Sequence, residues 1–555
     1  MSPLPPPDFA ALVTPVADTA PGGPGIPADS LFGTDVTGSR LDGWWATHRT
    51  TPLWRRLFTW GAPALVVLTA AFTRLWNLGH PASLVFDETF YVKDAWTLWN
   101  LGYEASWPAE ADALFNAGNA NIFHTDASFV VHPPLGKWII ALGMAAFGPE
   151  NPVGWRISTA IVGILAVILI MLIAKKLFSS TLLAVIAGGL FAIEGNAIVM
   201  SRVALLDNHL MLFLLLGFGA VLLDRSHSAR LLDRWVARRT TAERSLDWGP
   251  SLWGRPWLIA AGLAFGLASA VKWSGLYFLA GFAIYTLVVD ALARRRAGIT
   301  FWGTGTLVKQ APVTFVLAIP AALAAYLVTW TGWFLNAASY GRQFANQPGN
   351  AWEGPFAWVP HALQSFWHFQ VSVYQYHVGE MRPHPYQANP LTWLFMVRPT
   401  SMYWLSSSNG DNDCTADMCG SSITGIANPL IWFAATAAVL YLTYRLARYR
   451  EWKVGLILMG VAAGYLPWLL YLHRTVFQFY TIAFEPYLIL ALTFAIGLIV
   501  GSARDPWWKR ERGLGLLAVL VGFAIVLSVF FWPLWTGTQI DYTWMRAHWW
   551  FESWR

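Results

Sequence analysis

The sequence predicts an all-α polytopic membrane protein, and three observations support this. Charged residues are only 12% of the 555 residues, about half of the roughly 25% usual in soluble globular proteins. Hydrophobic residues are 56%, and the mean hydropathy is +0.44. The 34 Trp residues fit this class because indole rings favour membrane–water interfaces. The composition excludes a disordered chain, a coiled coil and an ordinary soluble enzyme, and the net charge of +6 does not indicate a nucleic-acid partner.

Residues 1–57 differ from the rest of the chain. The first 30 residues hold eight prolines and neither Lys nor Arg. A secretory signal begins with basic residues followed by an apolar run, which this stretch lacks. We therefore expect 1–57 to be a disordered polar tail on the cytoplasmic side.

Apolar segments long enough, or nearly long enough, to cross about 30 Å of hydrocarbon follow this tail. The stretch 134–148 is also apolar, but its 15 residues suit an interfacial or re-entrant helix better than a span. We expect about eleven spans, at 58–78, 153–177, 181–199, 203–223, 257–271, 273–292, 311–334, 428–447, 454–472, 480–501 and 514–533.

The distribution of positive charge is consistent with eleven spans. With the N-terminus in the cytoplasm, 25 of the 37 Lys and Arg residues fall in cytoplasmic segments, as the positive-inside rule requires. The transmembrane domain then occupies 58–535 of a protein in the plasma membrane. Two large loops, 79–152 and 335–427, and the C-terminal tail 536–555 lie on the outer face.

Both cysteines, Cys414 and Cys419, belong to the second large loop. An oxidising outer compartment permits a disulfide between them. Two free thiols in a mobile loop are the alternative.

Unusual polar residues gather near the outer face in this topology. A transporter would instead keep such residues near the bilayer midplane, on broken helices. Together they could form one cavity at the depth of the lipid headgroups. They are Asp87, Glu88, His132, Lys137, Arg156, Arg202, Asp207, Lys272, Arg474 and Gln478.

These residue types suit a substrate that carries a phosphate and a second group that loses a proton. A carboxylate of the Asp87 and Glu88 pair can serve as general base toward an attacking hydroxyl. Cations can hold a lipid phosphate and stabilise it as it leaves. Each residue also has a plain alternative, because loop carboxylates are usually solvated and basic residues at helix ends usually reach headgroups. The candidate cations are Arg156, Arg202, Lys272 and Arg474.

The order of short motifs resembles the protein O-mannosyltransferase family, membrane glycosyltransferases of the C type that use a lipid-phosphate sugar. Phe86, Asp87 and Glu88 after the first span begin the resemblance, which covers about 58–535. Further matches follow in the family's order: His132 to Lys137, Trp155 with Arg156, Ser201 with Arg202, Leu205 to Asp207, Val271 to Trp273, Gly275, His384 to Gln387, Arg398, Trp404, Arg474 and Phe477.

The resemblance implies a C-type glycosyltransferase fold and a specific reaction. Mannose would pass from polyprenyl-phosphate-mannose to Ser or Thr hydroxyls of exported proteins, with inversion. Asp87 would be the base, Glu88 would orient acceptor or sugar, and the four cations would include the phosphate ligands. Membrane lipids would be partners, and the secretion translocon is a further candidate partner. Supporting or substrate-binding residues would be His132, Lys137, Asp207, His384, Gln387, Arg398 and Gln478.

The second large loop, 335–427, departs from the eukaryotic members of the family. It is too short for their soluble β-trefoil domain, so the chain resembles the bacterial branch. The matched motifs contain no further carboxylate pair to complete a divalent-metal cage, so we expect neither a metal nor a cofactor. A transferase that glycosylates a glycolipid or wall polysaccharide is the alternative enzyme, and a transporter or lipid flippase is the alternative class.

Overall fold

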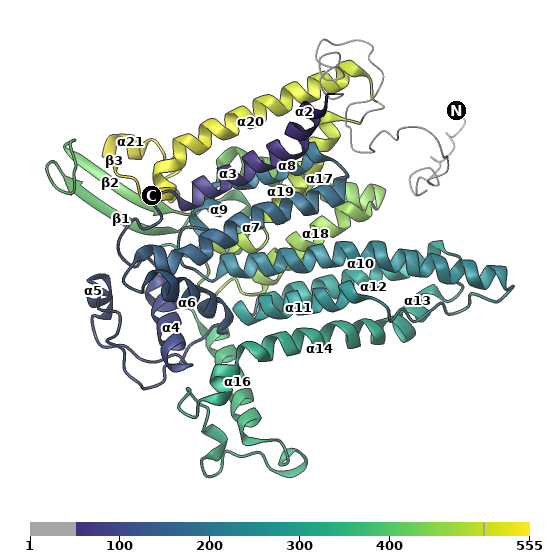
Figure 1. The fold of residues 1–555 in the computed structure, drawn as a ribbon, viewed down its shortest axis with the longest axis horizontal. Coiled ribbons are helices and arrows are strands. Elements are labelled where there is room, and N and C mark those ends of the chain that lie inside the picture. Colours follow the sequence, from purple (N-terminus) through teal and green to yellow (C-terminus); the bar gives the residue numbers. More distant parts are fainter. Residues whose placement is uncertain (1–50, 503–504) are drawn as a thin grey trace.

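The computed structural model describes residues 51–502 and 505–555, and long helices running side by side dominate it (Figure 1). Most of the predicted tail 1–57 lies outside the described residues. Within the described ranges, eight helical segments have the length and composition to cross a membrane. They are Pro52–Leu75 (α2, η2 and α3), α7 Pro152–Phe178, α10 Asp207–Thr241, α12 Gly275–Arg296, Trp302–Thr329 (α13, η3 and α14), α17 Pro429–Tyr449, Trp452–Leu470 (α18 and η7) and α20 Trp507–Thr536.

Every predicted span coincides with an apolar helix, but the number of eleven is not confirmed. Three of the predicted spans are helices too short to cross alone: α8 Thr181–Ala192, α11 Pro256–Val271 and α19 Glu485–Val500. The predicted segment 181–199 breaks because Glu194 accepts a hydrogen bond from the backbone N–H of Ala197 and starts a separate helix, α9 Gly195–Met200.

Small residues bring α11 and α14 into close contact. A Cβ atom added to Gly262 would lie 2.3 Å from the carbonyl oxygen of Ala318, and one added to Gly266 would lie 2.3 Å from that of Ala322. The spacing of these two glycines is the G-x-x-x-G pattern that allows helix backbones to approach each other in a bilayer. The end of α11 carries Lys272, so this packing fixes the position of a candidate site residue.

The two large loops and the C-terminal segment meet at one end of the helix bundle, the left end in Figure 1, which we call the loop end. The first loop contains α4 Glu88–Leu101, α5 Ala111–Asn116 and the predicted short apolar helix, α6 Leu135–Phe147. The second follows α15 Thr331–Leu335 and contains η4 Phe344–Asn346, η5 Gly354–Phe356, α16 His361–Gly379 and η6 Pro390–Phe395.

A small sheet at the loop end was not predicted from the sequence. Strands β1 Ser401–Ser408 and β2 Met418–Thr424 form an antiparallel hairpin, and β3 Ile540–Asp541 pairs with β2. A disulfide between Cys414 and Cys419 closes the turn of the hairpin. The C-terminal elements α21 Tyr542–Arg546 and η9 Glu552–Trp554 follow β3.

Candidate active site

The start of α4 places two adjacent carboxylates in different surroundings. Glu88 is fully buried, and its two oxygens accept hydrogen bonds from Nε and Nη2 of Arg156, both at 2.8 Å. The backbone N–H groups of Val85 and Ala204 donate to the same carboxylate. Four protein donors therefore satisfy Glu88. Its predicted role in orienting acceptor or sugar does not fit this geometry, because no part of the carboxylate is left for a ligand.

Asp87 is only partly buried, and its carboxylate accepts no hydrogen bond from any described residue. Burial raises the pKa of Asp87 to about 6. The cation of Lys272 opposes this rise, and the negative charge of Asp207 adds to it. A carboxylate with a pKa near neutrality and no competing partner has the properties of a general base.

Lys272 and Asp207 form a buried ion pair beside Asp87. Lys272 follows the last residue of α11, and its Nζ lies 2.7 Å from Oδ2 of Asp207 in the first turn of α10. The Lys272 ammonium also lies 5.0 Å from the ring centre of Tyr480. The attraction between the two charges offsets part of the cost of burying them. The ammonium of Lys272 has three N–H donors, so it can also donate to a ligand.

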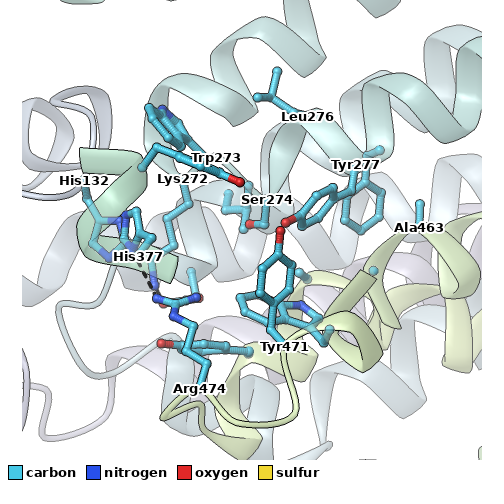
Figure 2. A pocket seen from close by; sticks show the side chains of 18 of the residues that line it. His132, Lys272, Trp273, Ser274, Leu276, Tyr277, His377, Ala463, Tyr471 and Arg474 are labelled. Carbon is cyan, nitrogen blue, oxygen red and sulfur yellow. Dashed lines mark hydrogen bonds and ion pairs between the residues drawn. The ribbon is translucent and has the colours of Figure 1, made fainter. Parts of the chain in front are cut away.

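A cavity of about 320 Å³ lies next to this ion pair, and Figure 2 shows the side chains around it. Part of its wall is polar: His132, Asp207, Lys272, His377 and Arg474. The rest is largely apolar or aromatic and comes mainly from α12, α18 and η7: Leu276, Tyr277, Phe278, Ala463, Gly464, Trp468 and Tyr471. The cavity can therefore hold a ligand with an anionic head and an apolar chain.

Arg474 brings a cation with unused donors to this cavity. Its Nη2 lies 3.1 Å from Nδ1 of His377, and its guanidinium packs over Trp468 at 5.6 Å from the ring centre. The Nε atom of Arg474 is buried without a hydrogen-bond partner among the described residues. Such an unsatisfied buried donor favours an anionic ligand that supplies the acceptor.

The other two predicted phosphate cations have structural partners instead. All five N–H donors of Arg156 are used, by Glu88 and by the carbonyls of Leu78, Pro81 and Ser83. Arg202 donates to the carbonyls of Trp76 (2.6 Å) and Asn77 (3.2 Å), at the C-terminal end of α3. This geometry argues against phosphate binding by Arg156 and Arg202, because Arg156 holds the start of the first loop and Arg202 caps the C-terminal end of α3.

Two of the predicted supporting residues lie away from the cavity wall. Lys137 is buried in an ion pair with Glu104. Its Nζ lies 3.9 Å from Asp94, so it ties α6 to α4. Gln478 is buried and donates to the carbonyl of Trp393 at 2.9 Å.

The block from His384 to Gln387 does not line the cavity, and its His384 packs against Phe86, the residue before Asp87. The His384 ring contacts Phe86 and Phe477 with centroid distances of 5.9 and 5.0 Å. Gln387 is exposed and accepts a hydrogen bond from the backbone N–H of His384. Arg398 donates to the carbonyl of Pro385 and to two carbonyls of the C-terminal segment. Three motifs distant in sequence thus meet at Phe86.

His377 and most of the aromatic wall were not predicted from the sequence. Nothing in the sequence around His377 marks it, because it lies in the aromatic helix α16 without a recognised motif. Its place beside Arg474 depends on how the second loop folds back over the first. The residues that the structure describes include no group of three or more His, Cys, Asp or Glu arranged to hold a metal ion.

Comparison with known proteins gives consistent matches along the whole transmembrane region. Residues 64–336 match the family described as dolichyl-phosphate-mannose-protein mannosyltransferase, and residues 362–554 match the C-terminal four TMM region of protein-O-mannosyltransferase. A polyprenol-phosphate-mannose–protein mannosyltransferase of Mycolicibacterium smegmatis is 33% identical over 509 residues, covering 89% of this chain and 93% of that protein. The protein of the same name from Mycobacterium tuberculosis is 31% identical over 511 residues, covering 90% and 92%.

A solved structure shows the same fold. The protein O-mannosyltransferase Pmt1-Pmt2 complex of S. cerevisiae bound to the sugar donor matches with a TM-score of 0.67 at 15% sequence identity. The match covers 92% of this chain and 94% of that chain. The C-type glycosyltransferase fold implied by the motifs is therefore confirmed.

Proposed function

The chain belongs to the protein O-mannosyltransferase family, and from this membership we propose that it transfers mannose from polyprenyl-phosphate-mannose to Ser or Thr hydroxyls of exported proteins. The names of its bacterial relatives support both the donor and the class of acceptor. The observation that carries the proposal is one site that combines Asp87, a carboxylate with no hydrogen-bond partner among the described residues, with the cavity-lining cations Lys272 and Arg474.

The shape of the cavity matches the two parts of the donor. Arg474 has donors left for the phosphate, and Lys272 adds a second positive charge. Leu276, Phe278 and Ala463 offer an apolar wall to the first isoprene units. A soluble nucleotide sugar would gain little from such a wall, whereas a lipid-linked sugar buries its chain there.

The reaction we propose is a single displacement. Asp87 takes the proton of the acceptor hydroxyl while the hydroxyl oxygen attacks C1 of mannose. The bond between C1 and the phosphate oxygen breaks, and its electron pair leaves with polyprenyl phosphate. Arg474 and Lys272 stabilise that negative charge. Attack from the face opposite the leaving phosphate inverts the configuration at C1, and neither a metal nor a cofactor takes part.

We propose further that the loop end faces the outside of the plasma membrane and that the N-terminus is cytoplasmic. The basic residues of the sequence support this orientation, because the segments joining the other ends of the spans carry most of them. Acceptors would then reach Asp87 as extended chains leaving the secretion translocon. The disulfide in the β1–β2 turn agrees with an oxidising compartment.

Transfer of label from the donor tests this function. Purified protein in detergent is incubated with radiolabelled polyprenyl-phosphate-mannose and a Ser/Thr-rich acceptor peptide, and the products are separated into peptide and lipid fractions. We expect the label on the peptide. Mild alkali should release this label, because O-linked sugars are removed by β-elimination. Label found only in glycolipid or polysaccharide would instead favour the alternative transferase.

A further inference from the structure

His377 of the second large loop forms hydrogen bonds through both ring nitrogens, one to the first large loop and one to Arg474. Its Nε2 lies 2.8 Å from the carbonyl oxygen of Val131 in the first loop, and its Nδ1 lies 3.1 Å from Nη2 of Arg474. His132, the residue after Val131, packs its ring against that of His377 with a centroid distance of 5.2 Å. Figure 2 shows His132, His377 and Arg474 together on one side of the cavity.

The partners fix the tautomer of His377. A carbonyl oxygen can only accept, so Nε2 carries the hydrogen that is donated to Val131. A guanidinium can only donate, so Nδ1 must offer its lone pair to Arg474. Burial and the Arg474 cation lower the pKa of His377 to about 4, and burial also lowers the pKa of His132 well below its usual value. Both rings are therefore neutral at physiological pH.

This contact restricts Arg474 without neutralising it. Arg474 lies in the irregular segment between η7 and η8 Gln478–Ala483, and a long side chain there has many rotamers. No described carboxylate lies within ion-pair distance of its guanidinium. A neutral imidazole can hold one Nη atom and leave the full positive charge, together with the unpaired Nε, for a ligand.

We propose that His377 is a positioning residue that aims the Arg474 guanidinium at the phosphate of the lipid donor. The inference rests on the proposed function, since it names a residue that completes the same site. It also explains the position of α16 in the second loop, because this helix brings His377 to the cavity while Val131 of the first loop sets its tautomer. Arg474 is then oriented only when both loops are in place.

A double-mutant cycle on donor binding tests the proposal. Binding of polyprenyl-phosphate-mannose, and of polyprenyl phosphate alone, is measured in detergent at fixed salt for the parent, His377→Phe, Arg474→Ala and the double variant. His377→Phe keeps an aromatic ring for His132 but removes both hydrogen bonds. We expect each single change to weaken binding roughly tenfold, and the double variant to bind no more weakly than Arg474→Ala alone, because coupled residues are not additive.

Two amide substitutions distinguish a role of His377 in positioning Arg474 from a role in packing alone. In His377→Asn the amide oxygen lies near the position of Nδ1 and can accept from Arg474, whereas in His377→Gln the amide lies near Nε2 and can reach only Val131. We expect Asn to recover donor binding to within about threefold of the parent and Gln to bind as weakly as Phe. A purely structural role would make the two amides alike. His368→Phe, on the exposed face of α16, is the matched control and should bind like the parent.

The outcomes distinguish this inference from the proposed function. The role of His377 is overturned if the losses in the cycle are additive or if the Asn and Gln variants bind the donor equally well. The proposed function still stands in that case, provided that the parent protein mannosylates peptide. A parent that binds the lipid donor without transferring mannose to peptide overturns only the function. A parent that binds no lipid donor overturns both. Thermal melting of each variant shows whether it is folded, and the Asn and Gln pair still decides the question if Phe is not tolerated.

Discussion

The pH dependence of mannosyl transfer is the sharpest test of Asp87 as the base. A base must be ionised to act, so kcat/KM should rise with pH through the pKa of the free enzyme. With the pKa of Asp87 at about 6, about nine-tenths of the protein is active near pH 7 and about one-tenth near pH 5, a tenfold fall. An Asp at the ordinary value of 3.8 would remain mostly ionised at both pH values.

The assay is the initial rate of transfer to peptide at low donor concentration, from about pH 4.5 to pH 8. Asp87→Asn keeps the shape of the side chain but cannot take a proton, so its rate should fall by roughly a hundredfold or more and lose the acidic limb. Asp126→Asn, an exposed position in the same loop, is the control and should keep the parental profile. A parental rate that stays constant down to pH 4.5, or an Asp87→Asn protein of normal activity, would refute the assignment.

Three further expectations concern the scaffold, and one concerns the chemistry. Glu88→Gln should lower the free energy of unfolding by about 3–5 kcal/mol, because it leaves Arg156 buried without its counter-charge, and thermal melting measures this. Arg202→Ala should lower the melting temperature more than it lowers donor affinity, because its partners are carbonyls at and just beyond the end of α3. Replacing Cys414 and Cys419 by Ser should cost about 2 kcal/mol of stability from loop entropy, seen as a lower denaturant midpoint in non-reducing buffer. Incubation with EDTA should leave the transfer rate unchanged, since the described residues offer no cluster of metal ligands.

The spans could be predicted because the backbone of a segment in the bilayer must satisfy its own hydrogen bonds. An apolar run that crosses the bilayer must be helical, so hydropathy alone locates it. The ends of helices are less predictable, because local capping and helix propensity decide them. Helix α10 continues to Thr241, far beyond the predicted end at 223, since Leu, Ala and Arg continue the helix after the apolar stretch ends. The β1–β2 hairpin was missed because its strands depend on pairing with each other and with β3.

The candidate site could be predicted as a set of residues but not as a set of roles. The sequence places Arg156 and Arg474 alike, as cations near helix ends on one face. In the structure Arg156 forms an ion pair with the buried carboxylate of Glu88, whereas Arg474 is hydrogen-bonded to the neutral side chain of His377. Which partner each cation meets is a long-range property, since Glu88 and Arg156 are 68 residues apart and His377 and Arg474 are 97 apart. No local sequence pattern predicts such pairings.

The adjacent carboxylates of the Asp-Glu pair show how one short motif can serve two purposes. Successive residues at the start of a helix point in directions about 100° apart, so Asp87 and Glu88 cannot both face the same group. Glu88 points into the protein, where Arg156 and two backbone donors hold its carboxylate in place. That anchor holds the first turn of α4 against the loop after α3. Asp87 therefore needs no partner of its own to stay in place, and a carboxylate without a partner is the one that remains free to take a proton.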